Sequence, residues 1–247
     1  MVLEDRTCVV TGASRGIGRG IAEELAAHGA TVVVNYRSSA AEAEATAETI
    51  RDDGGDAIVA QADVTDFDAV NAMHDEVRER VGPVDVLVNN AGITQDVSFA
   101  RMTPDQWRRV LDVHLDGMFN ATKAFFEDIT ESEAGRLINI SSVVGKQGNF
   151  GQANYATAKS GMFGFTRTLA LELARYGATA NSIAPGFTRT EMLESVDDEV
   201  QADIREGIPL GRFATVDDLS GVVRFLASDA SAYITGEVID VNGGIDL

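Results

Sequence analysis

The sequence predicts an α/β fold in which a doubly wound parallel sheet of about seven strands carries helices on both faces. Short apolar runs alternate with stretches of helical periodicity along the whole chain. The runs are almost continuously apolar, as expected for strands that are covered on both faces. A glycine-rich turn directly follows the first run, which is typical of the Rossmann-type arrangement.

The apolar runs are predicted to form the strands. In chain order they are residues 7–10, 31–35, 57–61, 84–88, 136–140, 179–184 and 237–241. Valine, isoleucine and alanine dominate them, and glycine or polar residues bound them. Because helical stretches separate the runs, and parallel strands need such long crossover connections, parallel pairing is predicted.

Helices are predicted between the strands, at residues 16–28, 40–53, 66–80, 103–130, 152–176 and 215–227. Their starts are well marked. Thr103 is expected to be an N-cap, followed by Pro104 in the first turn and by Gln106 as its capping-box partner. Asp66 and Asp217 place acids at two further helix N-termini, where the helix dipole favours negative charge.

A single domain is expected to span residues 1–247. Open α/β sheets reach this size as one unit, and no linker, repeat or low-complexity segment divides the chain. The least regular stretch is 186–211, which follows the sixth strand and so overhangs the edge where ligands bind in open sheets. We interpret it as a substrate lid, with a variable surface insertion as the alternative.

The turn Thr11-Gly12-Ala13-Ser14-Arg15-Gly16-Ile17-Gly18 lies between the first strand and the first helix. Glycine lets such a turn be tight and lets a pyrophosphate approach the backbone. The helix N-terminus that follows offers free N–H groups and the positive end of the helix dipole. The spacing differs from the Gly-x-Gly-x-x-Gly form, but its strand–turn–helix context predicts a dinucleotide site rather than a turn without a ligand.

The residues at the end of the second strand indicate whether the cofactor is NAD(H) or NADP(H). An NAD site of this kind places an acid there to hold the ribose 2′-hydroxyl. Here Asn35 and Tyr36 are followed by Arg37, and Arg15 lies in the glycine turn. Guanidinium groups match the geometry of phosphate, so the sequence predicts NADP(H) as the cofactor.

Tyr155 and Lys159 are four residues apart and therefore share one face of a predicted helix. An ammonium beside a phenol stabilises the phenolate, so we expect Lys159 to lower the pKa of Tyr155. Ser142 follows the strand 136–140, from which its hydroxyl can reach a substrate oxygen. A surface tyrosine and lysine would show the same spacing, and the cofactor motifs upstream favour the catalytic interpretation.

Taken together, these motifs resemble the short-chain dehydrogenase/reductase family over nearly the whole chain, from about Thr7 to Gly244. The motifs occur in the family's order: Thr11–Gly18, Asp63-Val64, Asn89-Asn90-Ala91-Gly92, Ser142, Tyr155 with Lys159, Pro185-Gly186 and Val241-Asn242-Gly243-Gly244. The resemblance implies that Ser142, Tyr155 and Lys159 are catalytic and that Asp63 contacts the adenine. The cofactor groove that it implies is formed by Gly12, Ser14, Arg15, Gly16, Ile17, Gly18, Arg37, Asp63, Val64, Asn89, Ala91, Gly92, Tyr155, Lys159, Pro185, Gly186 and Thr188.

The resemblance also implies a homotetramer, because relatives pair through the helices at 103–130 and 152–176 and through the last strand. Gly161, Gly164 and Ala170 would allow close approach of a second chain, although packing of this helix on its own sheet explains small residues equally well.

One position departs from the family pattern. The family usually has an asparagine within the segment Asp112-Val113-x-Leu115, where it holds a water that links the lysine to bulk solvent; this chain has His114. A histidine can bind such a water through either ring nitrogen, so His114 is a candidate catalytic residue. A buried, neutral histidine that only packs is the alternative, and the sequence leaves both open.

Two sister groups within the family are similar to residues 89–96 and 141–155. They are the acetoacetyl-CoA reductases of polyhydroxyalkanoate synthesis and the 3-oxoacyl-acyl-carrier-protein reductases of fatty acid synthesis. Residues 150–152 are closer to the first group, and residues 141–145 and 232–237 are closer to the second. The resemblance implies an acyl-thioester pocket formed by Asp96, Gln147, Phe150, Gln152 and Phe187, with Met192 and Leu193 on the lid.

The formal charge is −19, from 39 acidic and 20 basic side chains, and the only lysines are Lys123, Lys146 and Lys159. Such a surface repels nucleic acid and anionic membranes, so neither is an expected partner. An acid excess with few lysines predicts a halophilic protein, since the Debye length falls to about 3 Å in molar salt and the repulsion is screened. An ordinary acidic protein is the alternative.

The single cysteine, Cys8, lies in the first predicted strand and cannot form an internal disulfide, so a buried apolar role is expected. Residues 1–5 lack the basic and apolar regions of a signal peptide, and no run reaches membrane-spanning length. A cytoplasmic location is therefore expected, and no metal site is expected.

These observations predict an NADP-dependent oxidoreductase that reduces a 3-oxoacyl thioester to the (3R)-hydroxyacyl thioester. Salt-accumulating cells are largely archaea, many of which store polyhydroxyalkanoate, and this favours acetoacetyl-CoA as the substrate and 3-hydroxybutyryl-CoA as the product. A carrier-protein thioester, or another carbonyl or alcohol, is the alternative. A non-catalytic NADP-binding regulator is the alternative of a different class, which the intact Ser142, Tyr155 and Lys159 disfavour.

Overall fold

A computed structural model of the protein describes residues 2–190, 193 and 197–246. In this part of the chain one parallel sheet has the strand order β3-β2-β1-β4-β5-β6-β7. The strands are β1 (Thr7–Val10), β2 (Thr31–Tyr36), β3 (Asp56–Gln61), β4 (Val86–Asn89), β5 (Arg136–Ile140), β6 (Thr179–Pro185) and β7 (Val238–Val241). The predicted Rossmann-type sheet is confirmed, and its strand order reverses between β1 and β4, where open sheets bind ligands.

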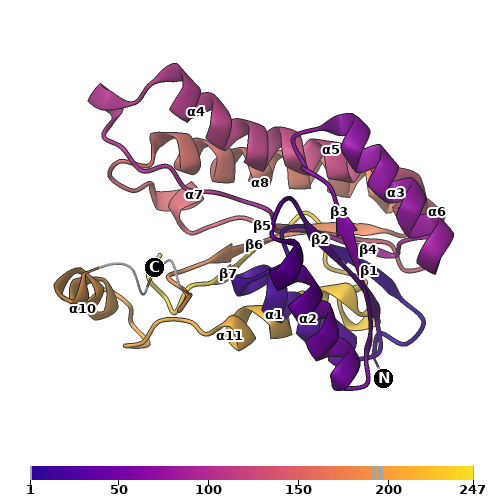
Figure 1. The fold of residues 1–247 in the computed structure, drawn as a ribbon. Coiled ribbons are helices and arrows are strands. Elements are labelled where there is room, and N and C mark those ends of the chain that lie inside the picture. The colour runs from indigo at the N-terminus through magenta and orange to yellow at the C-terminus, as the bar shows by residue number, and fades with distance from the viewer. Residues whose placement is uncertain (1, 191–192, 194–196, 247) are drawn as a thin grey trace.

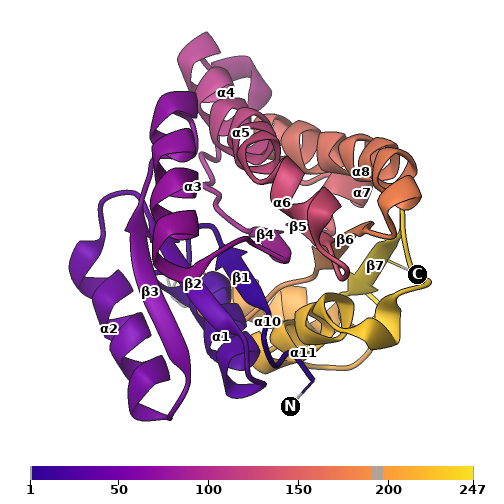
Figure 2. The same cartoon turned by 90° about the vertical axis from the view of Figure 1, so that its right-hand side faces the viewer.

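Two layers of helices cover the sheet (Figure 1). One face carries α1 (Gly16–Ala27), α2 (Ala40–Asp52) and α11 (Val216–Ala227). The other carries α3 (Phe67–Val81), α4 (Pro104–Leu111), α5 (Gly117–Ala124), α6 (Phe126–Glu131) and α8 (Ala153–Leu173). Figure 2 shows the sheet lying between the same two layers.

Alternate residues of the strands supply the two halves of the core. Val10 and Val34 belong to the apolar cluster under α1 and α11, whereas Val9 and Val33 belong to the cluster under α3, α5 and α8. Because the pleat sends successive side chains to opposite faces, a strand must be apolar on both faces to fill both clusters. This explains the continuous apolar runs of the sequence.

The predicted helix starts are present. Thr103 and Gln106 form a capping box, and the Asp66 carboxylate accepts from the backbone N–H groups of Asp68 and Ala69. Thr215 caps α11 in a second capping box, with Asp218 as the partner. Each cap satisfies N–H groups that would otherwise lack a partner at the helix terminus.

The prediction of one continuous helix over 103–130 was wrong in detail. A π-helical turn, Asp112–Asp116, separates α4 from α5, and the Gly117 N–H donates to the carbonyl of Asp112. Such a turn adds one residue to the helix and rotates the side chains that follow it. Its central residue is His114, which it turns into the protein interior, where only 2% of the residue is exposed.

The segment 186–211 is more regular than expected. It contains a helix, α10 (Asp198–Glu206), whose first turn is capped by the Asp197 carboxylate through the N–H of Glu199. A short helix, α7 (Val144–Gln147), also follows β5 where none was predicted. In the described part of the chain, no helix is long and apolar enough to cross a membrane.

Candidate active site

The glycine turn between β1 and α1 is closely packed against the loop that follows β4. Gly12 has a φ of +64°, and a β-carbon at this position would lie 2.9 Å from the Cα of Ala91. The Asn90 amide donates to the carbonyls of Thr11 and Gly12, at 2.9 and 3.1 Å. A side chain at Gly12 would therefore be strained and would also push the two loops apart.

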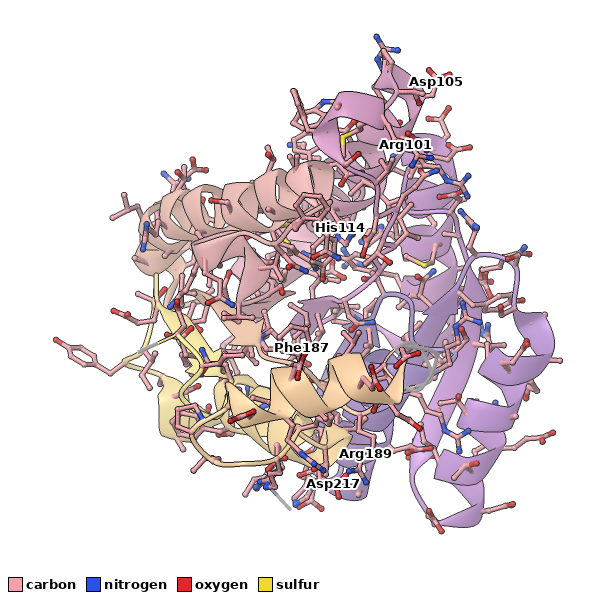
Figure 3. The ribbon with its side chains drawn as sticks, turned by 90° about the vertical axis from the view of Figure 1, so that its left-hand side faces the viewer. Arg101, Asp105, His114, Phe187, Arg189 and Asp217 are labelled. Atoms are coloured by element: carbon pink, nitrogen blue, oxygen red, sulfur yellow. The ribbon has the colours of Figure 1, made fainter. Side chains whose placement is uncertain are left out.

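These loops border a cavity of about 740 Å³ at the carboxyl ends of the strands. Figure 3 shows two residues of its lining, with His114 beneath the α4 and α8 layer and Phe187 beside α10. The predicted site residues that line it are Gly12, Ser14, Arg15, Gly16, Ile17, Gly18, Arg37, Asp63, Val64, Ala91, Gly92, His114, Ser142, Gln152, Tyr155, Lys159, Pro185, Gly186, Phe187 and Thr188. The fold thus brings the cofactor motifs and the predicted catalytic residues to one cavity.

Four predicted residues lie elsewhere. Asn89 is buried beneath the sheet edge, where its amide donates to Thr122 and Asn139, and the neighbouring Asn90 lines the cavity instead. Asp96, Gln147 and Phe150 are exposed outside the lining, and 90% of Phe150 is exposed. Asp96 still contacts the site indirectly, because it accepts from the Gln152 amide at 2.8 Å.

Sequence analysis missed several lining residues. They are Asn35, Tyr36, Ser38, Ser39, Ala62, Asn90, Ile93, Thr94, Val113, Ile140, Ser141, Val144, Asn149 and Thr190. Tyr36, Ser38 and Ser39 flank Arg37, so their place at the end of β2 and just after it was a signal that could have found them. Asn35 gave no such signal, because its amide is fixed between Gly12 on one side and Ala60 and Ala62 on the other.

The cavity fits a dinucleotide phosphate. No side chain of the described residues caps the N-terminus of α1, and its first residue, Gly16, with a φ of +58°, has open space where a β-carbon would lie. Free N–H groups at a helix N-terminus bind phosphate. Arg15 and Arg37 are exposed on the same lining, and no carboxylate of the described chain forms an ion pair with either.

Lys159 is anchored to the end of β5. Its ammonium donates to the carbonyl of Ile140 at 2.7 Å, and its own carbonyl accepts from the Ser141 hydroxyl at 2.7 Å. The ammonium lies 5.5 Å from the centroid of the Tyr155 ring. Burial lowers the pKa of Lys159 to about 7, because an ammonium is less stable inside the protein than in water.

The expectation that Lys159 makes Tyr155 acidic was wrong for this structure. Burial raises the pKa of Tyr155 to about 12, which outweighs the lowering effect of its hydrogen bond with Ser142, and the charge of Asp96 raises it further. The Lys159 ammonium donates to the Ile140 carbonyl. Tyr155 is consequently protonated at neutral pH, which is the form that can donate a proton to a substrate oxygen.

Comparison with known proteins agrees with this site. A family model described as enoyl-(acyl carrier protein) reductase matches residues 12–246. The chain belongs to the short-chain dehydrogenase/reductase family. As a member of that family it is an oxidoreductase, and the regulator alternative loses its support.

The relatives of this short-chain dehydrogenase/reductase match it over nearly their full length. A 3-oxoacyl-[acyl-carrier-protein] reductase FabG of Staphylococcus aureus (strain Mu50) is 47% identical over 240 residues, which are 97% of this chain and 98% of the relative. A 3-oxoacyl-[acyl-carrier-protein] reductase of Synechocystis sp. is 46% identical, with 98% of each chain covered. An acetoacetyl-CoA reductase of Allochromatium vinosum is 45% identical, with 97% of this chain and 98% of the relative covered.

His114 is neutral in this short-chain dehydrogenase/reductase. Its ring packs edge-on against Tyr155, with 5.2 Å between centroids, and its Nε2 lies 2.8 Å from the Ile93 carbonyl. Nε2 also lies 3.2 Å from the Ile93 nitrogen, and the shorter contact, with the carbonyl, requires the proton on Nε2. Nδ1 is then a buried acceptor without a partner among the described residues. Burial, followed by the charge of Lys159, lowers the pKa of His114 to about 3. Because His114 does not change its charge near pH 6.5, a proton relay through it would leave no step near that pH in the pH profile of the activity.

The low pKa predicts an effect on stability instead. The unfolded chain binds a proton on His114 below about pH 6.5, and the folded chain does not until about pH 3. Stability is therefore lost as the pH falls through this range, by about 1 kcal/mol for each pH unit. We expect His114→Asn, which has no proton to bind, to reduce the loss of unfolding free energy between pH 6 and pH 5 by this amount in guanidinium titrations. Equal losses in the two proteins would show that His114 is protonated in the fold.

The lid residues divide between two environments. Leu193 is buried in a small apolar cluster with Ile208 and Phe213, while Phe187 packs on this cluster and also lines the cavity. Met192 lies outside the described residues. The cluster joins the segment after β6 to the loop that precedes α11. That the segment 186–211 closes over a substrate is still a prediction.

The small residues of α8 have different surroundings. Ala170 is buried in the core beneath the helix and cannot be reached by a second chain. A β-carbon at Gly161 would lie 3.2 Å from Leu115, whereas Gly164 faces open space. Gly161 and Gly164 are both exposed, so these two of the three keep the predicted role at an interface.

Proposed function

We propose that the protein reduces the 3-oxo group of a 3-oxoacyl thioester with NADPH and releases the (3R)-hydroxyacyl thioester. The observation that supports this most is one continuous lining that contains the phosphate-binding turn, Ser142 and a protonated Tyr155. Relatives named for reduction of 3-oxoacyl thioesters share 45–47% of the sequence.

Each residue has a separate part in the reduction. When bound, NADPH supplies a hydride to the carbonyl carbon. Tyr155 donates its proton to the carbonyl oxygen as negative charge develops there, and the Ser142 hydroxyl hydrogen-bonds the same oxygen. In its charged form, Lys159 holds a positive charge near the phenolate that Tyr155 becomes. Arg15 and Arg37 would hold the 2′-phosphate of the cofactor.

The carrier of the acyl group has two candidates. We favour acetoacetyl-CoA, reduced to 3-hydroxybutyryl-CoA for polyhydroxyalkanoate synthesis, on the halophilic composition. The names of the Staphylococcus and Synechocystis relatives support an acyl-carrier-protein thioester as the second candidate.

We further infer that the protein is a homotetramer, in keeping with the exposed Phe119 and Leu171 on α5 and α8.

A paired assay tests this proposal. NADPH oxidation is followed in molar KCl with acetoacetyl-CoA and with the acetoacetyl thioester of an acyl-carrier protein. A higher kcat/KM for the CoA thioester supports the first candidate, and the reverse order supports the second. Oxidation of NADPH with neither thioester, but with an unrelated ketone, would overturn the thioester proposal as a whole.

Salt is expected to stabilise the fold. With a formal charge of −19, repulsion within the folded chain is strong at low ionic strength, and molar KCl reduces it to contacts within about 3 Å. We expect the midpoint of thermal unfolding to rise steadily from dilute buffer to molar KCl. Circular dichroism can follow it, with a nearly neutral relative as the control. A higher midpoint in dilute buffer than in molar KCl would refute the halophilic interpretation.

A further inference from the structure

A row of polar side chains lies between the sheet and the helices α5 and α8, close to the catalytic residues. Asn89 on β4 is in register with Asn139 on β5, and Asn139 is in register with Ser182 on β6. Thr122 on α5 and Thr166 on α8 complete the row from the helix layer. All five are buried, and Asn139, Thr166 and Ser182 are fully buried. We call these five residues, together with Ser141, the polar seam.

Hydrogen bonds connect all members of the seam except Ser141 into one chain. The Asn89 amide donates to Thr122 at 3.0 Å and to the Asn139 side-chain oxygen at 2.9 Å. The Asn139 amide donates to the Thr166 hydroxyl at 2.8 Å. Thr166 donates its one proton to the Met162 carbonyl at 2.8 Å, so Ser182, at 2.6 Å, is the donor to Thr166.

The seam ties α8 to β5 at two levels. The lower tie joins Asn139 to Thr166, and the upper tie joins the Ser141 hydroxyl to the Lys159 carbonyl at 2.7 Å. Ser141 directly follows β5 and continues its pairing with β6 through the Ile183 carbonyl. Residues 139 and 141 therefore share one face, because side chains alternate along extended chain. Lys159 and Thr166 are seven residues apart and so share one face of the helix. Two ties along one strand and one helix define both the height and the rotation of α8.

The position of α8 matters for catalysis, because the catalytic groups are divided between α8 and the segment that follows β5. Ser142 follows β5 directly after Ser141, whereas Tyr155 lies one turn of α8 before Lys159. Apolar packing tolerates small shifts of a helix, but hydrogen bonds are directional. A buried polar row stabilises a core no better than apolar residues of the same shape, so its value lies in specifying one arrangement.

We propose that Ser141 and Thr166 are positioning residues, which hold α8 so that the Tyr155 hydroxyl meets the same substrate oxygen as the Ser142 hydroxyl. Neither is a catalytic residue in this proposal. The assay of this inference rests on the proposed reduction of a 3-oxoacyl thioester, but the seam itself does not.

The chain offers matched variants for a test. Thr166→Val keeps the shape of the side chain and removes the hydroxyl, which leaves the Asn139 amide and the Ser182 hydroxyl without their partner. Thr166→Ser keeps the hydroxyl and serves as the conservative rescue. Thr168→Val makes the same chemical change on the exposed side of α8, where the one partner of the Thr168 hydroxyl among the described residues is the Gly164 carbonyl, at 3.1 Å.

The measurement is single-turnover oxidation of bound NADPH by a 3-oxoacyl thioester, well below the unfolding midpoint of every variant. We expect Thr166→Val to slow hydride transfer about tenfold, because small misplacements of reacting groups are costly. The affinity for NADPH, followed by fluorescence, should stay within about twofold, because the glycine turn is not joined to the seam. Thr166→Ser and Thr168→Val should react within about twofold of wild type.

Three results separate the outcomes. A Thr166→Val protein that is less stable but transfers hydride at the wild-type rate would overturn the positioning role. If Thr166→Val does not fold, Ser141→Ala at the upper tie decides, with a slowed transfer at unchanged NADPH affinity supporting the proposal and an unchanged rate overturning it. A wild type that binds NADPH but reduces no thioester would instead contradict the proposed function, and the seam would then be judged by the position of α8 in crystal structures of Thr166→Val and wild type.

Discussion

Tyr155→Phe should lower the rate of thioester reduction about a thousandfold, because it removes the proton donor while leaving the ring in place. The phenol pKa of about 12 keeps the proton on Tyr155 at neutral pH, and a developing alkoxide is basic enough to take it. Since the edge-on contact of the ring with His114 is retained, the binding of NADPH should change little. Steady-state kinetics with acetoacetyl-CoA, together with NADPH fluorescence, measure the two effects separately.

A control for this substitution lies on the same protein. Tyr176→Phe removes a hydroxyl from a partly exposed tyrosine outside the cavity, beside Arg175, and should leave turnover unchanged. If Tyr155→Phe retained more than a tenth of the wild-type rate, proton donation by this phenol would be ruled out.

Arg37→Asp should reverse the preference between the two cofactors. The arginine would hold the 2′-phosphate of NADPH, so its loss and the new negative charge are expected to raise the KM for NADPH about a hundredfold. An aspartate at this position can accept from the ribose 2′-hydroxyl, so the KM for NADH should fall. Kinetics with both cofactors at fixed thioester concentration give the ratio directly.

Arg108→Asp is the matched control, because it makes the same change of charge on the exposed side of α4, outside the cavity. Its cofactor preference should equal that of the wild type. An Arg37→Asp protein that still prefers NADPH by the wild-type factor would mean that Arg37 does not contact the phosphate.

Patterns that depend on local sequence were predicted well. The seven strands follow from continuous apolar runs, and the cap at Thr103 and the acid at Asp217 follow from single residues at the helix starts. The meeting of Ser142, Tyr155 and Lys159 could also be predicted, because all three lie at or near the carboxyl end of β5 or on the helix that packs against it.

Features that depend on distant contacts could not be predicted. The π-helical turn places His114 against the Gly92–Ile93 backbone, a contact that no local pattern of residues 103–130 indicates. Asn89 and Asn90 are adjacent, and only the pleat of β4 decides that Asn89 enters the core while Asn90 borders the cavity. The pKa of Tyr155 was misjudged for the same reason, because spacing shows neighbours but not desolvation.

The function is tested most directly by the stoichiometry of wild-type protein with NADPH and acetoacetyl-CoA in molar KCl. NADPH consumption and chiral analysis of the thioester product are followed in the same reaction. The predicted result is one (3R)-3-hydroxyacyl thioester for each NADPH oxidised. Folded protein that binds NADPH, yet leaves both the CoA and the carrier-protein 3-oxoacyl thioesters unreduced, would contradict the proposed function.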